Sequence, residues 1–397
     1  MQSGTALLAE IEEDLPLDQQ EDLADLKLTD GWSTGPSLWG TDWTTETIVN
    51  QLRRGNINLN PRFQRRNAWD TLRKSLFVES LILGLPVPQI ILAEDKGKKG
   101  GFVVIDGKQR LLTLRQFSAR PEGDDFEQLR LSGLSDRPEL NGLTYSALQE
   151  NERFSGELNI FDNQTIRTVV IRGWKDERYL YSVFLRINTG SVQLSPQELR
   201  QALHPGRFSD FIDDVSVERY GVKQLLKLRE PDFRMRDVEL VLRYFAYRNF
   251  SREYDGDLKR FLDDTTERMN RDWPKVAELL HQQVDELDNA LVRIREIFGE
   301  RNEVRKWNGQ IYEKRINRAV FDIMVYYFSN PQIRDSSRGR EGKIESAFKH
   351  ICEEDRAFLA SIERTTKSRE ANRTRFSTWA RVLSEVLGTK VESPFSG

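Results

Sequence analysis

Cysteine and histidine are scarce in this chain, and their scarcity argues against several kinds of site. The 397 residues include one cysteine, Cys352, so an internal disulfide cannot form and a cysteine-based zinc knuckle is not expected. The three histidines, His204, His281 and His350, lie far apart and form no His-Asn-His pattern. The sequence therefore predicts neither a disulfide-stabilised fold nor an HNH-type nuclease centre.

Long apolar runs are also missing. No apolar stretch approaches the roughly 20 residues that a membrane-spanning helix needs. The first residues have neither the basic start nor the apolar stretch of a secretory signal peptide. P-loop and protein-kinase motifs are absent as well. With 38% hydrophobic and 31% charged residues, we expect a cytoplasmic protein with a heavily charged surface and no membrane partner.

Charge is abundant in this chain, and it is unevenly distributed. The formal net charge is −3, but residues 1–31 hold nine acidic side chains and one basic side chain, Lys27. The other residues hold 59 basic and 54 acidic side chains, a formal charge of about +5. We predict that residues 1–35 are a flexible acidic tail and linker. Alternatively, the tail competes with a polyanion for a basic groove or docks a partner subunit.

Hydrophobic periodicity divides the remaining chain into two halves, which predict an α+β domain over residues 36–205 and an all-helical domain over residues 206–397. Beyond about Pro205 the strand patterns stop and long helical patterns follow. The first half is expected to begin with a linker through Gly40, a helix that ends near Gly55 and a short strand at "NINLNP". An amphipathic helix stopped by "GLPVP" follows, and then a hairpin of "IILAED" and "GFVVID". After an irregular segment over residues 123–164, a strand at "QTIRTVVIRG" and a helix at "RYLYSVFLRINTG" complete this half.

The segment "LSPQELRQAL" predicts the start of a further helix. Ser195 is placed as the N-cap, Pro196 as the first helical residue and Glu198 as the third. A serine N-cap followed three residues later by glutamate is a capping box, in which each side chain accepts a hydrogen bond from the other residue's backbone.

The stretch "VVIDGKQRLLTL" passes from an apolar strand into a helix through five residues that lack a large apolar group. Gly107 allows a tight turn, and the N–H groups after it are the free donors of a helix N-terminus, which favours an anion. Arg110 can hold two phosphate oxygens and Lys108 adds a charge, while Asp106 could hold a divalent metal or orient a water that Gln109 positions. The alternative is a solvated turn in which Asp106 only caps the helix.

Four segments of the chain together resemble one known family. "DGKQRLLTL" is similar to the Asp-Gly-Gln-Gln-Arg motif of the GmrSD-type restriction-endonuclease N-terminal domain, a branch of the ParB/sulfiredoxin-like fold. The other segments are "INLNPRFQRRNAWD…SLILGLPVPQIIL", "VFLRINTGSVQLSPQELRQAL" and "RMRDVELVLRYFAYRN" with "YDGDLKRFLDD". The resemblance runs from about Asp42 to Asp264. It implies a ParB/sulfiredoxin-like domain with a small mixed sheet, followed by a helical part.

The resemblance implies nucleotide binding and hydrolysis, coupled to DNA restriction or modification sensing in anti-phage defence. Asp106, Gly107, Gln109 and Arg110 fall on the family's nucleotide motif, whereas Lys108 replaces the usual glutamine. A lysine there keeps a phosphate contact but cannot act as the hydrogen-bond acceptor that an amide provides. Sulfiredoxin relatives carry a cysteine at this position, so sulfinic-acid reduction is excluded. Four more residues are implied to face the same pocket: Gln64, Arg65, Arg186 and Asn188.

The first hypothesis is therefore a ParB-like hydrolase of ATP or GTP that acts with Mg²⁺ bound at Asp106, as the sensor or switch of a defence system. The second hypothesis is a non-enzymatic module that binds DNA or a partner through the same phosphate pocket. The third is a metal-dependent DNA nuclease. Expected partners are a nucleotide, DNA and a separate nuclease or second defence protein, and self-association remains open.

Several residues leave a structural and a functional interpretation open. Basic clusters with aromatic residues in the helical half ("RNEVRKWNGQIYEKRINR", "RTTKSREANRTRFSTWAR") fit either nucleic-acid contact or ordinary basic helix faces. In the first case Trp307, Tyr312 or Trp379 could stack on bases. Trp69 is assigned to the core rather than to a base-stacking platform. A set of charged residues at helical spacing fits either an ordinary charge ladder or a site: Arg236, Asp237, Glu239 and Arg243.

Overall fold

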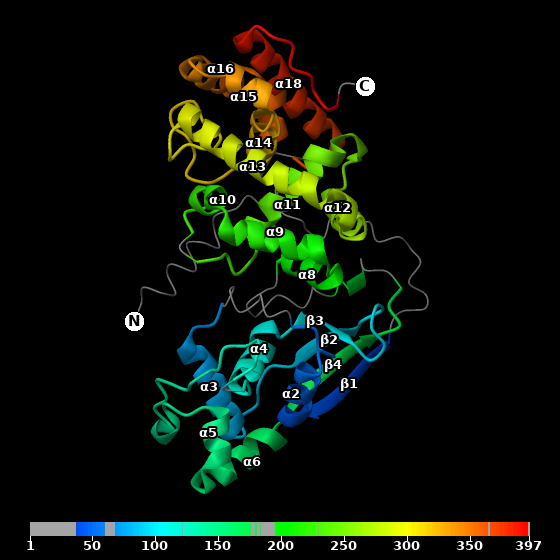
Figure 1. Ribbon diagram of the computed structural model, residues 1–397, viewed down its shortest axis with the longest axis vertical. Coiled ribbons are helices and arrows are strands. Elements are labelled where there is room, and N and C mark those ends of the chain that lie inside the picture. Colours follow the sequence, from blue (N-terminus) through cyan, green and yellow to red (C-terminus); the bar gives the residue numbers. More distant parts are fainter. Residues whose placement is uncertain are drawn as a thin grey trace. The chain divides into compact units, whose positions relative to one another are not determined.

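The computed structural model describes most of the chain, namely residues 37–59, 68–120, 122–175, 179–180, 183, 195–228, 230–363 and 366–395. The described residues form two compact units (Figure 1). Of the described residues, those between 37 and 203 and those from 232 to 235 form the N-terminal unit, and those from 204 to 231 and from 236 onward form the helical unit. The helix expected at "RYLYSVFLRINTG" lies mostly outside the described residues.

A four-stranded mixed sheet organises the N-terminal unit, with the strands in the order β1-β4-β2-β3. The central strands β4 and β2 are parallel, and both outer pairs, β1 with β4 and β2 with β3, are antiparallel. The bounds of the strands are Ser37–Thr44 for β1, Ile90–Glu94 for β2, Phe102–Asp106 for β3 and Thr165–Arg172 for β4. The sheet confirms the predicted hairpin, the predicted strand before residue 173 and the small mixed sheet.

Strand β1 corrects the prediction that the linker extends through Gly40. Its residues pair in register with β4, from Ser37 opposite Arg172 to Thr44 opposite Thr165. The strand lies at the sheet edge and most of its side chains are exposed, so it carries little of the buried alternation that marks a strand in a sequence. The short strand expected at "NINLNP" is also wrong in its described part, where Ile57 forms a single parallel bridge with Phe102.

The expected irregular segment between residues 123 and 164 in fact contains two short helices, α5 (Tyr145–Glu150) and α6 (Ser155–Asn163). They are held by aromatic contacts. The ring of Phe161 lies 5.3 Å from that of Phe117 on α4, and the Phe117 ring lies 5.8 Å from that of Tyr145. Because helices of six to nine residues are marginal alone, tertiary packing rather than local pattern stabilises them.

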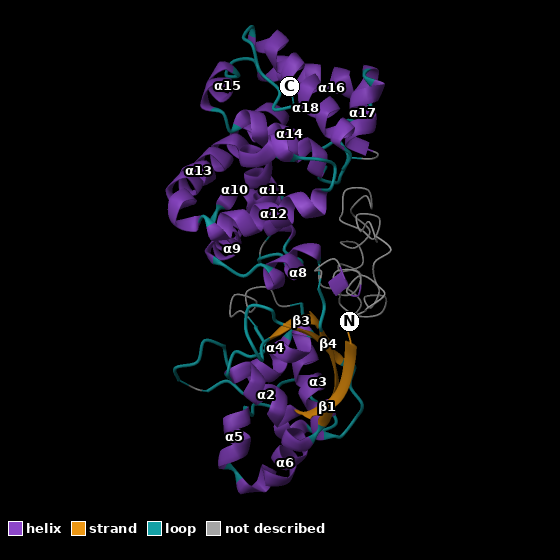
Figure 2. Ribbon diagram, turned by 90° about the vertical axis from the view of Figure 1, so that its right-hand side faces the viewer, coloured by secondary structure: helices purple, strands orange, loops and turns teal. Residues whose placement is uncertain are grey.

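The three helices α2 (Thr45–Arg53), α3 (Thr71–Ile82) and α4 (Lys108–Phe117) agree with the predicted helical segments, and they lie beside the sheet in Figure 2. Side chains cap two of them, since Thr44 accepts a hydrogen bond from the backbone N–H of Thr47 and Asp70 from that of Arg73. Both are favoured N-cap residues.

Apolar residues lie on both faces of β2 and β3 and so fix where the end of β3 lies. Ile91, Ile105 and Leu199 belong to one buried cluster, which brings helix α8 (Pro196–Leu203) onto one face of the sheet. The alternating residues Leu92 and Val104 are buried on the opposite face. Helix α8 therefore packs directly beside the strand that leads into "DGKQR".

The described part of the helical unit contains no strand, which confirms the predicted all-helical second half. Its central helices are α11, in which ten of 15 residues are buried, and α14, in which ten of 11 are buried. None of the described helices is long and apolar enough to cross a membrane. The bounds of the helices are α9 Arg207–Glu218, α10 Tyr220–Leu225, α11 Arg236–Phe250, α12 Leu258–Arg271, α13 Trp273–Phe298, α14 Arg318–Phe328, α15 Pro331–Ser336, α16 Glu341–Glu354, α17 Arg356–Glu363 and α18 Arg369–Leu387.

Candidate functional site

The candidate site lies where β3 ends and α4 begins, and Gly107 is the residue that makes this turn. Its φ of +96° lies in the left-handed region that side chains disfavour. A Cβ atom here would lie 3.1 Å from Cγ1 of Ile90 and 3.3 Å from Nη2 of Arg110. Glycine is therefore required both by the backbone conformation and by the close approach of Arg110.

Asp106 and Arg110 face each other across this turn. Nη2 of Arg110 donates to Oδ2 of Asp106 at 2.9 Å and to the carbonyl oxygen of Gln89 at 2.9 Å. The Arg110 side chain is 6% exposed and the Asp106 side chain 16% exposed. The pair is thus largely screened from water, while the carboxylate keeps some access to solvent.

Lys108 forms a second, fully buried ion pair. Its Nζ donates to Oε1 of Glu198 at 2.5 Å, and both side chains are 5% exposed. The same Glu198 accepts from the backbone N–H of Ser195 through Oε2 at 2.8 Å, and Oγ of Ser195 accepts from the N–H of Glu198 at 3.1 Å. The predicted capping box is confirmed, and its glutamate also ties α8 to the first residue of α4.

The electrostatics of this helix end favour negative charge. Two cations, Lys108 and Arg110, lie in the first turn of α4, where the helix dipole is positive and where no acidic residue belongs to the helix. Asp106 and Glu198 supply the two carboxylates that compensate them. The β3–α4 junction therefore favours anions, and in this conformation the two carboxylates of Asp106 and Glu198 fill that role.

Two polar atoms at the junction have unused hydrogen-bonding capacity. Oε1 of Gln109 and Nε of Arg110 are buried, and within the described residues neither has a hydrogen-bond partner. A buried acceptor or donor without a partner typically costs about 1–3 kcal/mol. These atoms could therefore gain hydrogen bonds from a ligand or from a change in the surrounding side chains.

The structure brings together five of the predicted site residues and leaves the other four outside the described residues. Asp106, Gly107, Lys108, Gln109 and Arg110 meet at the β3–α4 junction. The residues outside are Gln64, Arg65, Arg186 and Asn188. Where the latter lie relative to the junction stays a prediction.

Sequence reasoning missed the second role of Glu198 and the contribution of the Gln89 carbonyl. Glu198 was identified only as a capping residue, although it lies ninety residues from the lysine that it neutralises. The available signal was a lysine at a position for which the family resemblance implies glutamine, because a buried lysine requires a carboxylate partner. Gln89 contributes a backbone carbonyl, so its side chain carries no signal in the sequence.

The structure answers the open interpretations of the aromatic residues only in part. Trp379 is fully buried in α18, so the prediction that it could stack on bases is wrong. The Trp307 and Tyr312 rings contact each other with centroids 5.1 Å apart, and Nζ of Lys349 lies 4.5 Å from the Trp307 ring. Trp69 is half-buried and contacts the Phe77 ring of α3 with centroids 5.7 Å apart, so it packs at the margin of the core rather than inside it.

The helical charge pattern at the start of α11 is more than a surface ladder. Glu239 and Arg243 do form an i,i+4 pair, with 3.7 Å between Oε1 and Nη1. The stronger contacts of Arg243, however, go to Asp322 on α14, which accepts from Nε at 2.9 Å and from Nη2 at 2.5 Å. Glu239 and Arg243 of this pattern therefore belong to a largely buried cluster of the helical unit.

One comparison with known proteins bears on this site. Residues 45–205 match the family model described as "GmrSD restriction endonuclease, N-terminal domain". The matched residues include the β3–α4 junction and α8. The helical segments between residue 205 and Asp264, which also resemble the family in sequence, lie outside the match. Searches of curated proteins and of solved structures gave no significant match.

Proposed function

On the premise that residues 45–205 form a GmrSD restriction endonuclease N-terminal domain, we propose that the β3–α4 junction binds the phosphates of a nucleoside triphosphate and hydrolyses it. Hydrolysis would drive a sensor or switch in a restriction system directed against phage. DNA and a separate nuclease or second defence protein are the partners that this function requires.

The observation that carries the proposal is the pairing of Asp106 with Arg110 at the N-terminus of α4. The helix dipole, the absence of a Cβ on Gly107 and the guanidinium together suit a phosphate group. A phosphate oxygen can replace the Asp106 carboxylate on Arg110, because both are anionic acceptors. Release of the carboxylate would leave Asp106 available to orient an attacking water, with Gln109 beside it.

Mg²⁺ fits this site as a companion of the phosphates rather than as an ion held by a protein cage. Among the described residues there is no group of three or more His, Cys, Asp and Glu side chains that could hold a metal. Mg²⁺ commonly uses one or two carboxylates and completes its coordination with water and phosphate oxygens. Asp106 alone satisfies that requirement, and a bound ion would neutralise part of the phosphate charge.

The Lys108–Glu198 pair has a positioning role in this proposal. Lys108 is the first residue of α4 and Glu198 lies in the first turn of α8, so the pair holds two helix N-termini together. Because both side chains are buried, the pair cannot exchange its partners as readily as the more exposed Asp106. We therefore assign phosphate contact to Arg110 and the backbone, and the maintenance of the junction to Lys108.

The test is release of phosphate from ATP or GTP by the full chain with Mg²⁺, before and after Asp106→Asn and Arg110→Ala. We expect a loss of at least about 100-fold for either variant, as for removal of a group that stabilises charge in the transition state. The matched controls are Asp42→Asn and Arg167→Ala. They alter an exposed Asp–Arg pair of the same sheet, with 3.3 Å between Oδ1 and Nη1, and should leave turnover unchanged.

Other outcomes would select the alternatives. A salt-dependent shift of labelled DNA without any turnover would support the non-enzymatic binding module. Nicking of plasmid DNA with Mg²⁺ and no added nucleotide, abolished by Asp106→Asn, would support the nuclease. Turnover that survives both junction variants would overturn the assignment of the site.

A further inference from the structure

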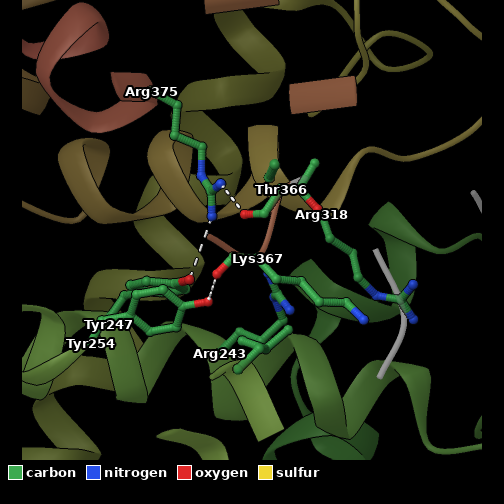
Figure 3. Close-up of a pocket in the computed structure, with 9 residues that line it drawn as sticks. Arg243, Tyr247, Tyr254, Arg318, Thr366, Lys367 and Arg375 are labelled. Carbon is green, nitrogen blue, oxygen red and sulfur yellow. Dashed lines mark hydrogen bonds between the residues drawn. The ribbon is translucent and has the colours of Figure 1, made fainter. Parts of the chain in front are cut away.

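A second site, unrelated to the β3–α4 junction, lies inside the helical unit. A small cavity is lined by four basic side chains, Arg243, Arg318, Lys367 and Arg375, and by the residues Tyr247, Tyr254, Leu258, Ala319 and Thr366. Figure 3 shows the arginines and tyrosines arranged around it. Its described lining contains no acidic residue. We infer that this cavity binds a phosphate oxyanion.

The three arginines of the cavity are buried to a degree that requires compensation by negative charge. Arg243, Arg318 and Arg375 are 3%, 4% and 1% exposed. Burial of a charge is costly unless it is paired and hydrogen-bonded, so each guanidinium must find acceptors in its surroundings. Bringing three buried guanidinium groups together costs electrostatic free energy, because like charges repel each other in a poorly solvated interior. The fold therefore maintains this cluster in spite of that cost.

In the contacts that the structure describes, the three arginines share the carboxylates of Asp322 and Glu239. Asp322 accepts two hydrogen bonds from Arg243 and also lies 3.5 Å from Nη2 of Arg375. Oε2 of Glu239 accepts from Nη2 of Arg318 at 2.9 Å. Arg375 uses neutral acceptors in addition, namely the carbonyl of Thr366 at 2.6 Å and Oδ1 of Asn372 at 2.6 Å.

Some donors of the cluster have no acceptor within the described residues. Nε of Arg375 makes no hydrogen bond, and neither does Nη1 of Arg243, whose nearest carboxylate oxygen is Oε1 of Glu239 at 3.7 Å. Both atoms belong to side chains that are more than nine-tenths buried and that line the cavity. An anion in the cavity could accept from such donors.

Three helices also begin at this cavity. Arg318 and Ala319 are the first two residues of α14, Leu258 is the first of α12, and Lys367 directly precedes Ser368, the N-cap of α18. Each helix presents the positive end of its dipole there. Helices of 11, 14 and 19 residues are long enough for this effect, which adds to the charge of the basic side chains.

The size of the cavity limits what can enter it. The cavity has a volume of about 10 Å³, which corresponds to roughly one water molecule. It therefore admits one oxygen of an oxyanion, and the partly exposed Lys367 is among the residues that line it. A phosphate has several charged oxygens and therefore suits the several donors better than chloride.

The experiment uses the full chain and follows hydrogen–deuterium exchange with inorganic phosphate or with chloride at equal ionic strength. We expect phosphate to slow exchange in peptides over residues 243–258 and 366–375. Lys367→Gln should weaken the apparent affinity about tenfold, the loss expected for one charge-assisted hydrogen bond. Peptides over residues 104–117 report the β3–α4 junction separately, so failure at one site is distinguishable from failure at the other.

The matched control is Lys390→Gln, which changes an 83% exposed lysine of the same unit and should leave the phosphate effect intact. Thermal melting of both variants checks their folding, and Arg318→Gln provides a second variant if Lys367→Gln unfolds. Equal protection by phosphate and chloride, or undiminished phosphate protection in a folded Lys367→Gln protein, would overturn the proposal.

A further arm identifies the source of the phosphate. An oligonucleotide with a 5′-phosphate is compared with the same oligonucleotide without it. Protection of the cavity peptides by the phosphorylated form alone assigns a terminal phosphate. Equal protection by both forms, lost in Lys367→Gln, assigns the nucleic-acid backbone.

Discussion

The β3–α4 junction and the cavity of the helical unit pair their buried basic side chains differently. At the junction Lys108 pairs with Glu198 and Arg110 with Asp106, so each of these cations has its own carboxylate. In the helical unit Asp322 lies between two arginines, Arg243 and Arg375. At the junction, one carboxylate for each cation leaves no net charge until a ligand displaces a carboxylate. At the cavity, a carboxylate shared by two arginines leaves positive charge that a ligand can neutralise.

Exposure decides which of these carboxylates a ligand can replace. The Asp106 side chain is 16% exposed and belongs to a pair four residues apart in one turn, so it can move into solvent. The Asp322 side chain is 0% exposed and lies on a central helix. A ligand of the N-terminal unit would therefore compete with the protein's own anion, while a ligand of the helical unit would add to it.

Asp322→Asn should have the largest effect on stability. The variant leaves two buried arginines without their carboxylate, so we expect a loss of about 3–5 kcal/mol in the helical unit. Hydrogen exchange of α11, α14 and α18 peptides would measure the loss locally. Asp335→Asn changes a 67% exposed carboxylate of the same unit and should have little effect. A small loss in Asp322→Asn would contradict the shared role of this carboxylate.

Lys108→Met should destabilise the N-terminal unit by about 3 kcal/mol, because Glu198 would remain buried without a cation. Lys108→Met combined with Glu198→Gln should recover much of this loss, since glutamine is neutral and can still accept from the Ser195 N–H. A double-mutant cycle of unfolding free energies measures the coupling. If the double variant is as unstable as the single one, packing rather than charge holds α8 at the junction.

Gly107→Ala should cost about 1–2 kcal/mol in the N-terminal unit, because alanine disfavours the left-handed conformation. The contact with Ile90 adds to this cost. Gly156→Ala is the matched control, since Gly156 lies in α6 with open space around its Cβ position, and there alanine should be neutral or stabilising. Equal effects of the two substitutions on the midpoint of thermal unfolding would contradict the special role of Gly107.

The smallest expected effect is a pH dependence in the N-terminal unit. Burial raises the pKa of Asp162, whose carboxylate accepts from the Tyr145 hydroxyl at 3.0 Å. The pKa of Asp162 is higher in the folded protein than in the unfolded chain. Its protonation therefore contributes to the free energy of unfolding at pH values below the pKa of the unfolded chain, and this contribution is lost as the pH rises through the pKa of the folded protein. Asp162→Asn should therefore gain stability over the wild type at pH 7 but not at pH 3, by less than about 1 kcal/mol. Parallel stability curves between these pH values would contradict it.

The elements that agreed with the sequence depend on short-range patterns. The hairpin of β2 and β3, the capping box at Ser195 and the helices α2, α3 and α4 are all encoded within a few residues. The strand β1 and the helices α5 and α6 were missed because an edge pairing with β4 and contacts with Phe117 stabilise them from a distance.

The sequence by itself determined the turn at Gly107 and the i,i+4 geometry that joins Asp106 to Arg110, because backbone sterics and helical spacing act locally. It also determined the helical character of the second half through periodicity. Only the tertiary structure decided that Lys108 pairs with Glu198 and that three helix N-termini meet four basic residues in one cavity. These contacts join residues tens of positions apart, and packing of the whole unit selects them.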